Sequence, residues 1–506
     1  MDRTGDPEEL LRLLGGWMSG QGPLYGKLAR ALHRAVRAGD LGRGERLPSE
    51  RALARALSVS RATVVAAYDE LRGLGVVESR RGSGTRIAAR PPGLGSVADG
   101  DGTDGRVPGG RATTLLQRML DGRDGQDGQD GQDGRDGRNG RDGTISLATT
   151  AEPAADEVRE ALRDVQREDL AALLGDTGYH PRGLPALREA VARRLTALGL
   201  STSAAQVLVT TGATQALGLV AQLYVRKGDV VVVESPSWPG CLDLFRAVGA
   251  VPHQVPLDED GMRVDGLAEA LARRGPALVT VTPTYHNPTG TLMSAHRRRR
   301  VAALCAERGV PVLEDLAYDS RTAADREEPP PLAAFAGPER AGAGVLTVGS
   351  LAKSVWAGLR IGWVRGPQEA VERLARLKAL ADLGCPVLDQ ALAARLLPRL
   401  DAIRAERAEG LRHGLAHLEG LLGERLPEWK WRTPDGGSAL WVRLPYGTDA
   451  RVYAQLALRY GVELVPGAAT DPDGAHDDHI RIPCALPEAT LTDLVHRLDA
   501  AWRSFH

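Results

Sequence analysis

The 506-residue sequence has few cysteines and no long hydrophobic run. Its four cysteines, Cys241, Cys305, Cys385 and Cys484, are far apart and form no CxxC pair, so neither a metal site nor a disulfide framework is indicated. A reducing cytoplasm fits this usage best. Nowhere do 18 uncharged apolar residues follow one another, and the start, MDRTGDPEEL, has no basic segment leading into an apolar one. Membrane insertion and export are therefore not predicted.

Lysine is also scarce, with five lysines among 64 basic residues. One of them, Lys353, lies between two apolar runs in VLTVGSLAKSVWAGLRIGWV, residues 345–364. Arginine would serve charge or solubility equally well, but its guanidinium always keeps its proton, so only lysine can condense with an aldehyde into a Schiff base. Taken alone, Lys353 is explained as a surface lysine in a loop. Together with the segments described below, it is a candidate anchor for an aldehyde cofactor.

Charge and composition divide the chain into three parts. Residues 24–90 hold 14 Lys and Arg against 6 Asp and Glu, a balance of +8 in a chain whose net charge is −1, so the remainder sums to −9. Charge gathered in one short module suggests a polyanion partner for that module alone. The predicted parts are a basic module at 20–89, a linker at 90–143, and an α/β body at 144–506 whose small lobe begins near residue 367.

The basic module has the pattern of a winged helix-turn-helix. Its apolar residues repeat at helical spacing, Ser60 can cap the third helix, and a Gly-rich turn joins two short β-type runs. This arrangement places the start of the third helix where side chains can reach base edges in a major groove. A small protein-binding module with a basic face is the alternative. The helices are expected at 24–38, 50–57 and from residue 60 onward, and the strands at 76–77 and 86–87.

Two groups of side chains, one at the helix starts and one in the wing, would then contact double-stranded DNA. Arg61 can pair with a guanine edge, whereas hydroxyl groups and backbone N–H groups suit phosphate oxygens. The wing can lie along the backbone or enter the minor groove. The candidate contacts from this geometry are Ser49, Ser60, Arg61 and Thr63 at the helix starts, and Arg80, Arg81 and Gly82 in the wing.

The run LPSERALARALSVSRATVVAAYDELRGLGVVESRRGSGT resembles the DNA-binding domain of GntR-type transcription regulators, over residues 23–88. The helix spacing, the SR at the start of the third helix and the RGSGT wing all occur in order. The resemblance implies that Arg51, Arg61, Thr63 and Gly82 contact promoter DNA.

Residues 91–143 have a different composition, with 15 glycines among 53 residues and DGx triplets from residue 121 onward. Glycine at every third position also occurs in collagen, but this repeat is short and contains no proline. A flexible, disordered linker is therefore predicted, in which residues 111–120 could form one or two helical turns.

The rest of the chain alternates short apolar runs with helical stretches, which predicts a mostly parallel sheet wrapped by helices. Polar segments follow the runs: TTGATQ, ESPSWPG, TPTYHNPTG, EDLAY and GSLAK. Ligands of open α/β sheets bind outside the carboxyl ends of the strands, so these segments should line one cleft together with Lys353. The runs are 207–210, 230–233, 277–281, 310–313 and 345–348.

Pyridoxal 5′-phosphate suits these segments. Its ring nitrogen needs a carboxylate to stay protonated, which Asp315 can supply, and its ring oxygen needs donors such as Asn287 and Tyr318. Each residue alone has a simpler explanation, such as a helix cap or a core position, but together they favour the cofactor. The phosphate would be held by Gly212, Ala213, Thr214, Ser350 and Arg360, and Trp238 would stack on the ring.

The motifs YHPRGLPALREAVARRL, TPTYHNPTG, DLAY, SLAKSVWAGLRIGW and HIRIPCA resemble fold-type I aminotransferases over residues 145–506. The resemblance implies that Lys353 bonds to pyridoxal phosphate, Asp315 holds the ring nitrogen, and Asn287 and Tyr318 flank the ring oxygen. It also implies a homodimer in which Tyr179 reaches the neighbouring subunit's phosphate. Arg481 would hold a substrate or effector carboxylate.

A GntR-type head on such a body resembles the MocR subfamily of regulators, with two departures: Trp238 replaces a frequent tyrosine, and Ala357 replaces a frequent proline. The leading hypothesis is a DNA-binding regulator that senses pyridoxal phosphate, or an amine or amino acid that reacts with it. The alternative is an active aminotransferase with a fused DNA-binding domain, which the spacing of Asp315 and Tyr318 leaves open. A third possibility keeps the fold without a cofactor.

Overall fold

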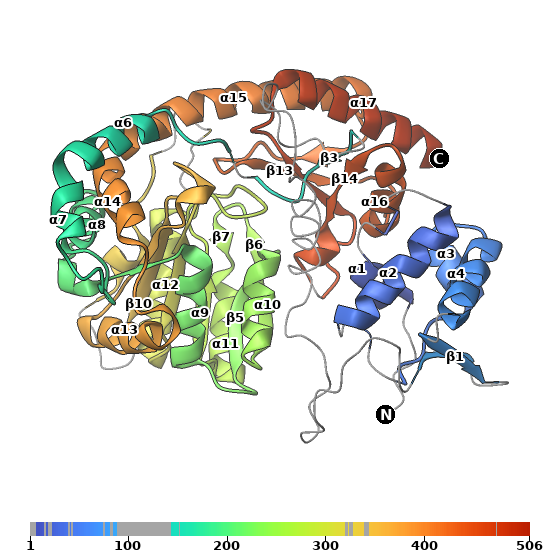
Figure 1. Cartoon of the computed structure of the whole chain (residues 1–506), viewed down its shortest axis with the longest axis horizontal. Coiled ribbons are helices and arrows are strands. Elements are labelled where there is room, and N and C mark those ends of the chain that lie inside the picture. Colours follow the sequence, from blue (N-terminus) through green and yellow to red (C-terminus); the bar gives the residue numbers. More distant parts are fainter. Residues whose placement is uncertain are drawn as a thin grey trace. The chain divides into compact units, whose positions relative to one another are not determined.

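A computed structural model describes most of the chain, which divides into two compact units (Figure 1). The first unit comprises residues 1–148, 446–469 and 493–506, and the second comprises residues 149–445 and 470–492. The described residues are 7–14, 17–18, 23–38, 41, 44–73, 76–80, 84–88, 143–150, 152–318, 322, 327–337, 344–471 and 473–505. The expected linker at 90–143, except Gly143, and the wing residues Arg81 and Gly82 lie outside them.

The N-terminal part of the first unit is a winged helix-turn-helix, as the sequence predicts. Its helices pack around fully buried leucines such as Leu28 and Leu53, and β1 pairs with β2 in antiparallel register. Helix α1, which the sequence patterns did not predict, adds its buried leucines to this core, and Trp17, beyond the end of that helix, packs there as well. The elements are α1 (Pro7–Leu14), α2 (Leu24–Ala38), α3 (Glu50–Ala56), α4 (Arg61–Gly73), β1 (Val77–Arg80) and β2 (Gly84–Ile87).

The same unit contains elements from the far end of the chain. Strand β3 pairs in parallel with β14, and Tyr453 of α16 donates its hydroxyl proton to the carbonyl oxygen of Leu498 at 2.8 Å. The elements are β3 (Ile145–Ser146), α16 (Ala450–Arg459), β14 (Val462–Glu463), β15 (Val465–Pro466) and the end of α17 (Glu488–Phe505).

The second unit is built on one large sheet with the order β4-β11-β10-β9-β8-β5-β6-β7. Strands β11 and β7 run antiparallel to their neighbours, and the other strands are parallel. The predicted, mostly parallel sheet is therefore confirmed. The strands are β4 (Val207–Thr210), β5 (Val230–Ser235), β6 (Val251–Asp258), β7 (Gly261–Met262), β8 (Leu278–Val281), β9 (Val312–Leu316), β10 (Val345–Ser350) and β11 (Gly362–Arg365).

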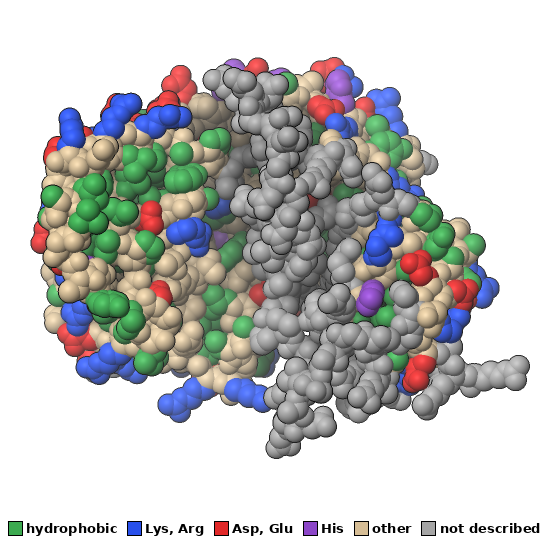
Figure 2. Space-filling view, viewed as in Figure 1, with side chains coloured by type: hydrophobic (Ala, Val, Ile, Leu, Met, Phe, Trp, Pro, Cys, Tyr) green, Lys and Arg blue, Asp and Glu red, His purple; other side chains and the backbone are tan. Residues whose placement is uncertain are grey.

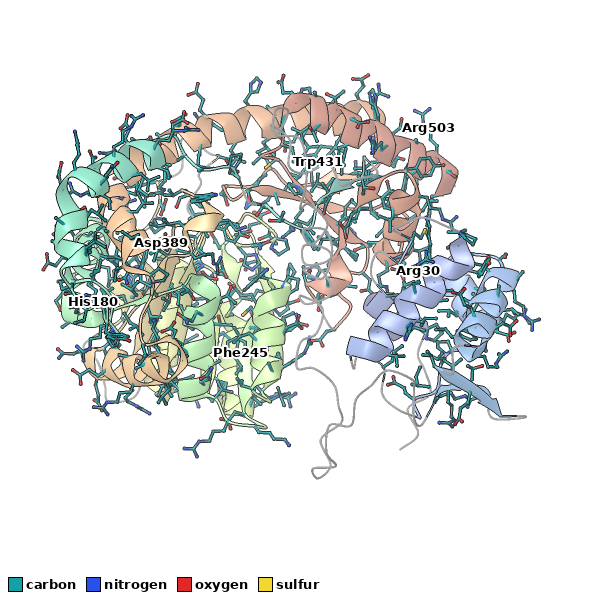
Figure 3. The ribbon with its side chains drawn as sticks, viewed as in Figure 1. Arg30, His180, Phe245, Asp389, Trp431 and Arg503 are labelled. Carbon is teal, nitrogen blue, oxygen red and sulfur yellow. The ribbon has the colours of Figure 1, made fainter. Side chains whose placement is uncertain are left out.

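Alternate strand residues point into two cores, one on each face of the sheet. Val209 and Val279 pack with α8, α11, α12 and α14, whereas Leu208 and Leu278 pack with α9, α10 and α13. Phe245 of α10, labelled in Figure 3, is fully buried in the second core. The helices are α8 (Pro185–Ala197), α9 (Ala213–Tyr224), α10 (Pro239–Ala247), α11 (Val264–Arg274), α12 (Ala295–Arg308), α13 (Gln368–Asp382) and α14 (Val387–Leu396).

A smaller sheet and a long helix complete the second unit. Strand β13 lies between β12 and β16 in antiparallel register. The small lobe expected from residue 367 stays a proposal, since α13 and α14 beyond that point pack in the large cores. The remaining elements are α6 (Glu157–Asp164), a π-helical segment η1 (Val165–Asp169), α7 (Leu170–Leu174), η5 (Leu397–Arg399), α15 (Leu400–Arg425), β12 (Lys430–Trp431), β13 (Ala439–Arg443) and β16 (His479–Pro483). Within the described part of the chain, no helix has both the length and the apolar character needed to cross a bilayer.

Candidate cofactor site and DNA-binding surface

Lys353 lies three residues beyond the end of β10, at the edge of the sheet where the parallel strands end. Its amine is partly buried, donates to the hydroxyl oxygen of Thr150 at 3.1 Å, and lies 5.6 Å from the centre of the Tyr318 ring. An amine held this way faces an aromatic ring and a hydroxyl and is partly shielded from water. The position suits an amine that must react with an aldehyde.

Asp315 lies on β9, the neighbour of β10 in the sheet. Burial raises the pKa of this carboxyl to about 6, with a smaller contribution from the charge of Glu314, while a hydrogen bond from the backbone N–H of Ala317 acts in the opposite direction. The carboxylate is therefore poorly solvated, and a cationic ring nitrogen beside it would stabilise its charge.

Asn287 and Tyr318 come from different loops and meet at this edge. The Asn287 side-chain amide donates to the Tyr318 hydroxyl at 2.9 Å. Both residues line a cavity with Thr150 and the segment 436–439. Arg481 of β16 is almost fully buried, and burial lowers the pKa of its guanidinium while the nearby Tyr318 raises it. These groups offer hydrogen-bond donors and a positive charge to an oxygen-rich ligand.

The predicted phosphate cradle begins with Gly212, the residue that precedes α9. Gly212 has a φ of 109°, and a side chain there would lie 3.2 Å from the guanidinium of Arg360. Arg360 donates to the carbonyl oxygen of Thr211 at 2.9 Å. Ala213 and Thr214 form the first turn of α9, whose free backbone N–H groups suit an anion.

Three other residues that were predicted to bind the cofactor have surroundings different from this group of side chains. The Ser350 hydroxyl bonds within its own turn, to the Ile361 carbonyl oxygen and the Ala352 N–H. The ring of Trp238 lies close to Gly240 at the start of α10 and packs against the second core. Tyr179 is 69% exposed beside α13. The roles predicted for these three residues remain proposals.

A buried acid–imidazole pair, which the sequence patterns did not predict, lies close to Asp315. Glu234 and His286 are each 3% exposed, with Oε2 and Nε2 separated by 3.5 Å. Burial raises the pKa of Glu234 to about 8, and burial together with the charge of His476 lowers the pKa of His286 to about 3. The pair is therefore uncharged near neutral pH. The acid at the start of ESPSWPG was the available sequence signal for Glu234.

The predicted DNA-contacting residues lie on α3, α4 and their approaches. The hydroxyl oxygens of Ser49 and Ser60 accept from the backbone N–H groups of Ala52 and Thr63, so both serines cap helices. Ser60 also shares a hydrogen bond with the Thr63 hydroxyl at 2.8 Å. Two further described candidates are Arg51, exposed on α3, and Arg80, in β1.

Arg61 begins α4 and is 70% exposed. Its guanidinium donates to Glu50 through Nη2 at 2.9 Å and through Nε at 3.3 Å. The carboxylate holds the arginine across the starts of the two helices, although solvent screening keeps such an exposed pair weak. Arg61 therefore retains N–H groups for a DNA base.

Both halves of the chain match families of known proteins. Residues 24–87 match the family "Bacterial regulatory proteins, gntR family", and residues 147–498 match "Aminotransferase class I and II". The MocR protein of Rhizobium meliloti, described as a probable rhizopine catabolism regulatory protein, is 30% identical over 70% of this chain and 68% of its own length. The chain belongs to the MocR-type GntR regulators.

Other relatives of this MocR-type regulator match one or both halves. YisV of Bacillus subtilis, described as an uncharacterized HTH-type transcriptional regulator, is 29% identical and covers 95% of both chains. The crystal structure of LysN, an α-aminoadipate aminotransferase of Thermus thermophilus complexed with N-(5′-phosphopyridoxyl)-L-leucine, is 30% identical with a TM-score of 0.64. That match covers 71% of the regulator and 92% of LysN, so the body of the regulator has the fold-type I aminotransferase fold.

Proposed function

We propose that this regulator binds promoter DNA through residues 20–89 and uses Lys353 to sense pyridoxal 5′-phosphate, or an amine or amino acid that reacts with it. The observation that carries the proposal is the meeting of Lys353, Asp315 and the Asn287–Tyr318 pair at one edge of the sheet, in a chain that also contains a winged helix-turn-helix. Because the chain must reach DNA, we infer that it acts in the cytoplasm.

When bound, pyridoxal phosphate supplies an aldehyde that bonds to an amine and a ring that withdraws electrons. Lys353 offers the amine, and Asp315 offers a negative charge to the ring nitrogen. Asn287 and Tyr318 donate to the ring oxygen, and the first turn of α9 with Arg360 binds the phosphate. Arg481 binds the carboxylate of an amino-acid effector.

The chain around Gly212 fits the phosphate. A side chain at Gly212 would meet the Arg360 guanidinium, and one at Gly362 would lie 2.8 Å from the backbone of Gly212. Glycine at both positions lets two backbones and an arginine approach one point, where an anion would neutralise the arginine. We infer that a bulky residue at Gly212 weakens phosphate binding.

We further propose that the regulator is a homodimer. Of the eight large hydrophobic side chains that are exposed among the described residues of the second unit, six lie on or near α6, α7, α13 and α14, and hydrophobic side chains gather on the face that carries α6 and α8 (Figure 2). Exposed apolar side chains in such number favour a protein interface. The six are Leu162, Leu174, Tyr179, Leu380, Leu383 and Leu388, here called the apolar face.

Substitution of the lysine tests the cofactor proposal. We expect Lys353→Ala to abolish the absorbance of lysine-bound pyridoxal phosphate, whereas Lys227→Ala, at an exposed lysine, keeps it. The same absorbance in both variants would refute a covalent role for Lys353. A colourless wild-type protein that ignores added pyridoxal phosphate would support the third possibility, the fold without a cofactor.

An active aminotransferase is the second candidate, because the site contains the lysine, the carboxylate and the buried arginine that transamination requires. Incubation with amino acids and a ketoacid distinguishes the two. Ketoacid release over many turnovers would favour the enzyme, whereas a spectral change that stops after one equivalent would favour the sensor.

A further inference from the structure

Thr150 contacts the lysine at the centre of the site, although 203 residues separate them in the sequence. Its side chain is 4% exposed, and its hydroxyl oxygen accepts from the Lys353 amine at 3.1 Å. Thr150 also lines the cavity shared by Asn287 and Tyr318. The hydrogen bond of this hydroxyl therefore depends on which atoms the lysine nitrogen is bonded to.

Thr150 ends a segment, residues 143–150, that we call the strap. The strap begins at Gly143, the last residue of the stretch predicted to be the linker, and its first part is bonded to β14 and to Gly461 before it. Backbone N–H groups of Ile145 and Leu147 donate to the carbonyl oxygens of Gly461 and Glu463 at 2.8 and 2.9 Å. The Ser146 hydroxyl donates to the Glu463 carboxylate at 2.7 Å. The strap thus makes hydrogen bonds to residues 461 and 463 along its first part and contacts the lysine through Thr150 at its end.

Strand β14 leads back to the DNA-binding head through the helix that precedes it. Arg459, the last residue of α16, donates to the carbonyl oxygen of Ser58 at 2.7 Å. Leu458 and Val59 both pack against the hydrophobic core of the head. Ser58 and Val59 form the turn between α3 and α4, so this contact touches the turn that orients the recognition helix.

The hydrogen-bonding capacity of the lysine nitrogen depends on its bonding state. A free lysine ammonium has three N–H donors, so it can donate to Thr150 while it makes other contacts. A nitrogen bonded to an aldehyde carbon through a double bond has at most one N–H, and its direction is fixed by the plane of that bond. The contact in which Thr150 accepts from the lysine is therefore favoured when Lys353 is free.

We propose that Thr150 is a positioning residue that reports the bonding state of Lys353 to the strap, and through β14 and α16 to the turn of the DNA-binding head. This inference rests on the proposed function. The strap is held by Lys353 when the lysine is free, as it is without cofactor or after an effector amine has displaced it. It is released when the lysine is bonded to the cofactor.

The test compares DNA affinity in two states of the full-length protein. Protein loaded with pyridoxal phosphate is titrated with a labelled DNA fragment from upstream of its own gene, before and after addition of aminooxyacetate. This probe reacts with the cofactor and frees the lysine, whatever the natural effector is. The absorbance of the cofactor monitors that reaction independently of DNA binding.

We expect the probe to change the wild-type Kd for DNA by about fivefold or more, within the usual range of coupling between sites. Thr150→Val, which keeps the shape of the side chain but has no hydroxyl, should respond less than about twofold while its cofactor absorbance still changes. Thr150→Ser, which keeps the hydroxyl, should respond as the wild type does. Rescue by serine would separate the hydrogen bond from simple packing.

Two variants outside the cofactor site test the rest of the route. Ser146→Ala removes the strap's bond to Glu463, and Arg459→Ala removes the bond to Ser58. Both should bind pyridoxal phosphate normally and lose the response of DNA affinity. They also keep the inference testable if Thr150→Val does not fold. Thr202→Val, at a threonine whose hydroxyl bonds to the Leu200 carbonyl oxygen, is the matched control and should respond normally.

The outcomes separate this inference from the proposed function. A full response in Thr150→Val would overturn the inference and leave the cofactor and DNA functions intact. A wild-type protein that binds cofactor and DNA but shows no response would overturn it as well. Failure of the wild type to bind pyridoxal phosphate or the DNA fragment would refute the proposed function, and the inference with it.

Discussion

Burial determines the charge of the ionisable groups at the site. The same desolvation raises the pKa of Asp315 to about 6 and of Glu234 to about 8, and lowers the pKa of His286 to about 3. At neutral pH, Asp315 is therefore mostly ionised, whereas Glu234 and His286 are uncharged. Of these three groups, only Asp315, which would face the ring nitrogen, carries a charge at neutral pH.

Cofactor affinity should fall as the pH is lowered from 7 to 5. Asp315 takes up a proton as the pH passes through its pKa of about 6 and can then no longer pair with a cationic ring nitrogen. Titration of cofactor-free protein with pyridoxal phosphate at each pH measures this. Asp315→Asn should bind about tenfold more weakly at pH 7, a loss of about 1.4 kcal/mol, and should lose most of the pH dependence. An unchanged affinity in Asp315→Asn would contradict this role.

The buried Glu234 should make the protein less stable at alkaline pH. Its pKa is higher in the folded state than in the unfolded state, so its contribution to stability is complete below pH 4.5 and is lost as the pH rises through 8. Glu234→Gln cannot ionise and should have a higher Tm than the wild type at pH 8.5. The two proteins should differ little at pH 5. A constant Tm difference across this range would show that Glu234 does not titrate as inferred.

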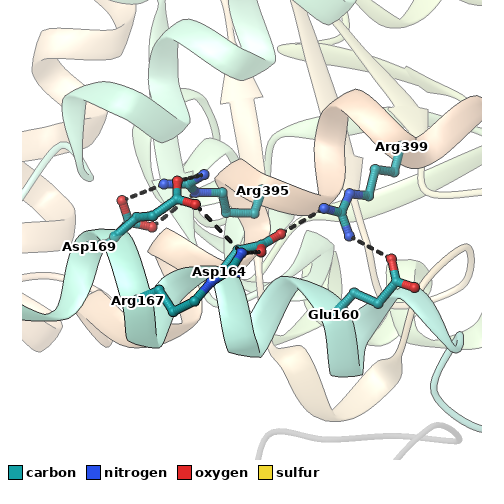
Figure 4. Close-up of polar contacts among 7 residues, drawn as sticks. Glu160, Asp164, Arg167, Asp169, Arg395 and Arg399 are labelled. Carbon is teal, nitrogen blue, oxygen red and sulfur yellow. Dashed lines mark hydrogen bonds and ion pairs between the residues drawn. The ribbon is translucent and has the colours of Figure 1, made fainter.

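At the scale of elements, two arginines join helices that are far apart in the sequence (Figure 4). Arg395 of α14 binds Asp169 through two hydrogen bonds, at 2.8 and 3.0 Å, and Arg399 of η5 binds Asp164 at 2.7 Å and Glu160 at 3.3 Å. Paired, two-pronged contacts of this kind contribute more than isolated surface pairs. The arginines hold α6 and η1 against the end of α14.

Arg395→Met should lower the Tm by about 2–4 °C, which corresponds to roughly 1 kcal/mol in a unit of this size. The difference should shrink at high salt because the partners are partly solvent-exposed. Arg193→Met is the control, since its pair with Glu189 is long, at 3.9 Å, and highly exposed. Equal effects in both variants would indicate a loss of general surface charge.

The elements were predictable where a local pattern encodes them. The strands of the large sheet are buried on both faces, which leaves continuous apolar runs such as 230–233 in the sequence. Helix α1 was missed because PEELLRLL is too short to show more than two turns of periodicity. Glu234 was recognisable as an acid after a strand, but its pKa depends on burial, which only the folded chain reveals. The contacts of Thr150 and Arg459 join distant residues and have no local pattern.

At the scale of the whole molecule, the apolar face should determine the oligomeric state. Leu380 is 88% exposed on α13, and Leu380→Glu should convert a dimer into a monomer because it places a charge in a buried interface. Sedimentation analysis measures the mass directly. Val251→Glu, at a half-exposed valine on β6, should stay dimeric. A wild-type monomer would contradict the proposed homodimer.

The antiparallel pairing of β10 and β11 returns the chain to the same edge of the large sheet. Ser350 lies opposite Gly362, so the turn between them presents Lys353 and Arg360 side by side in the sequence of one hairpin. The spacing of Lys353 and of Arg360, the proposed phosphate-binding residue, thus depends on the length of this turn. An insertion in this turn would move apart the two residues proposed to hold opposite ends of one small molecule.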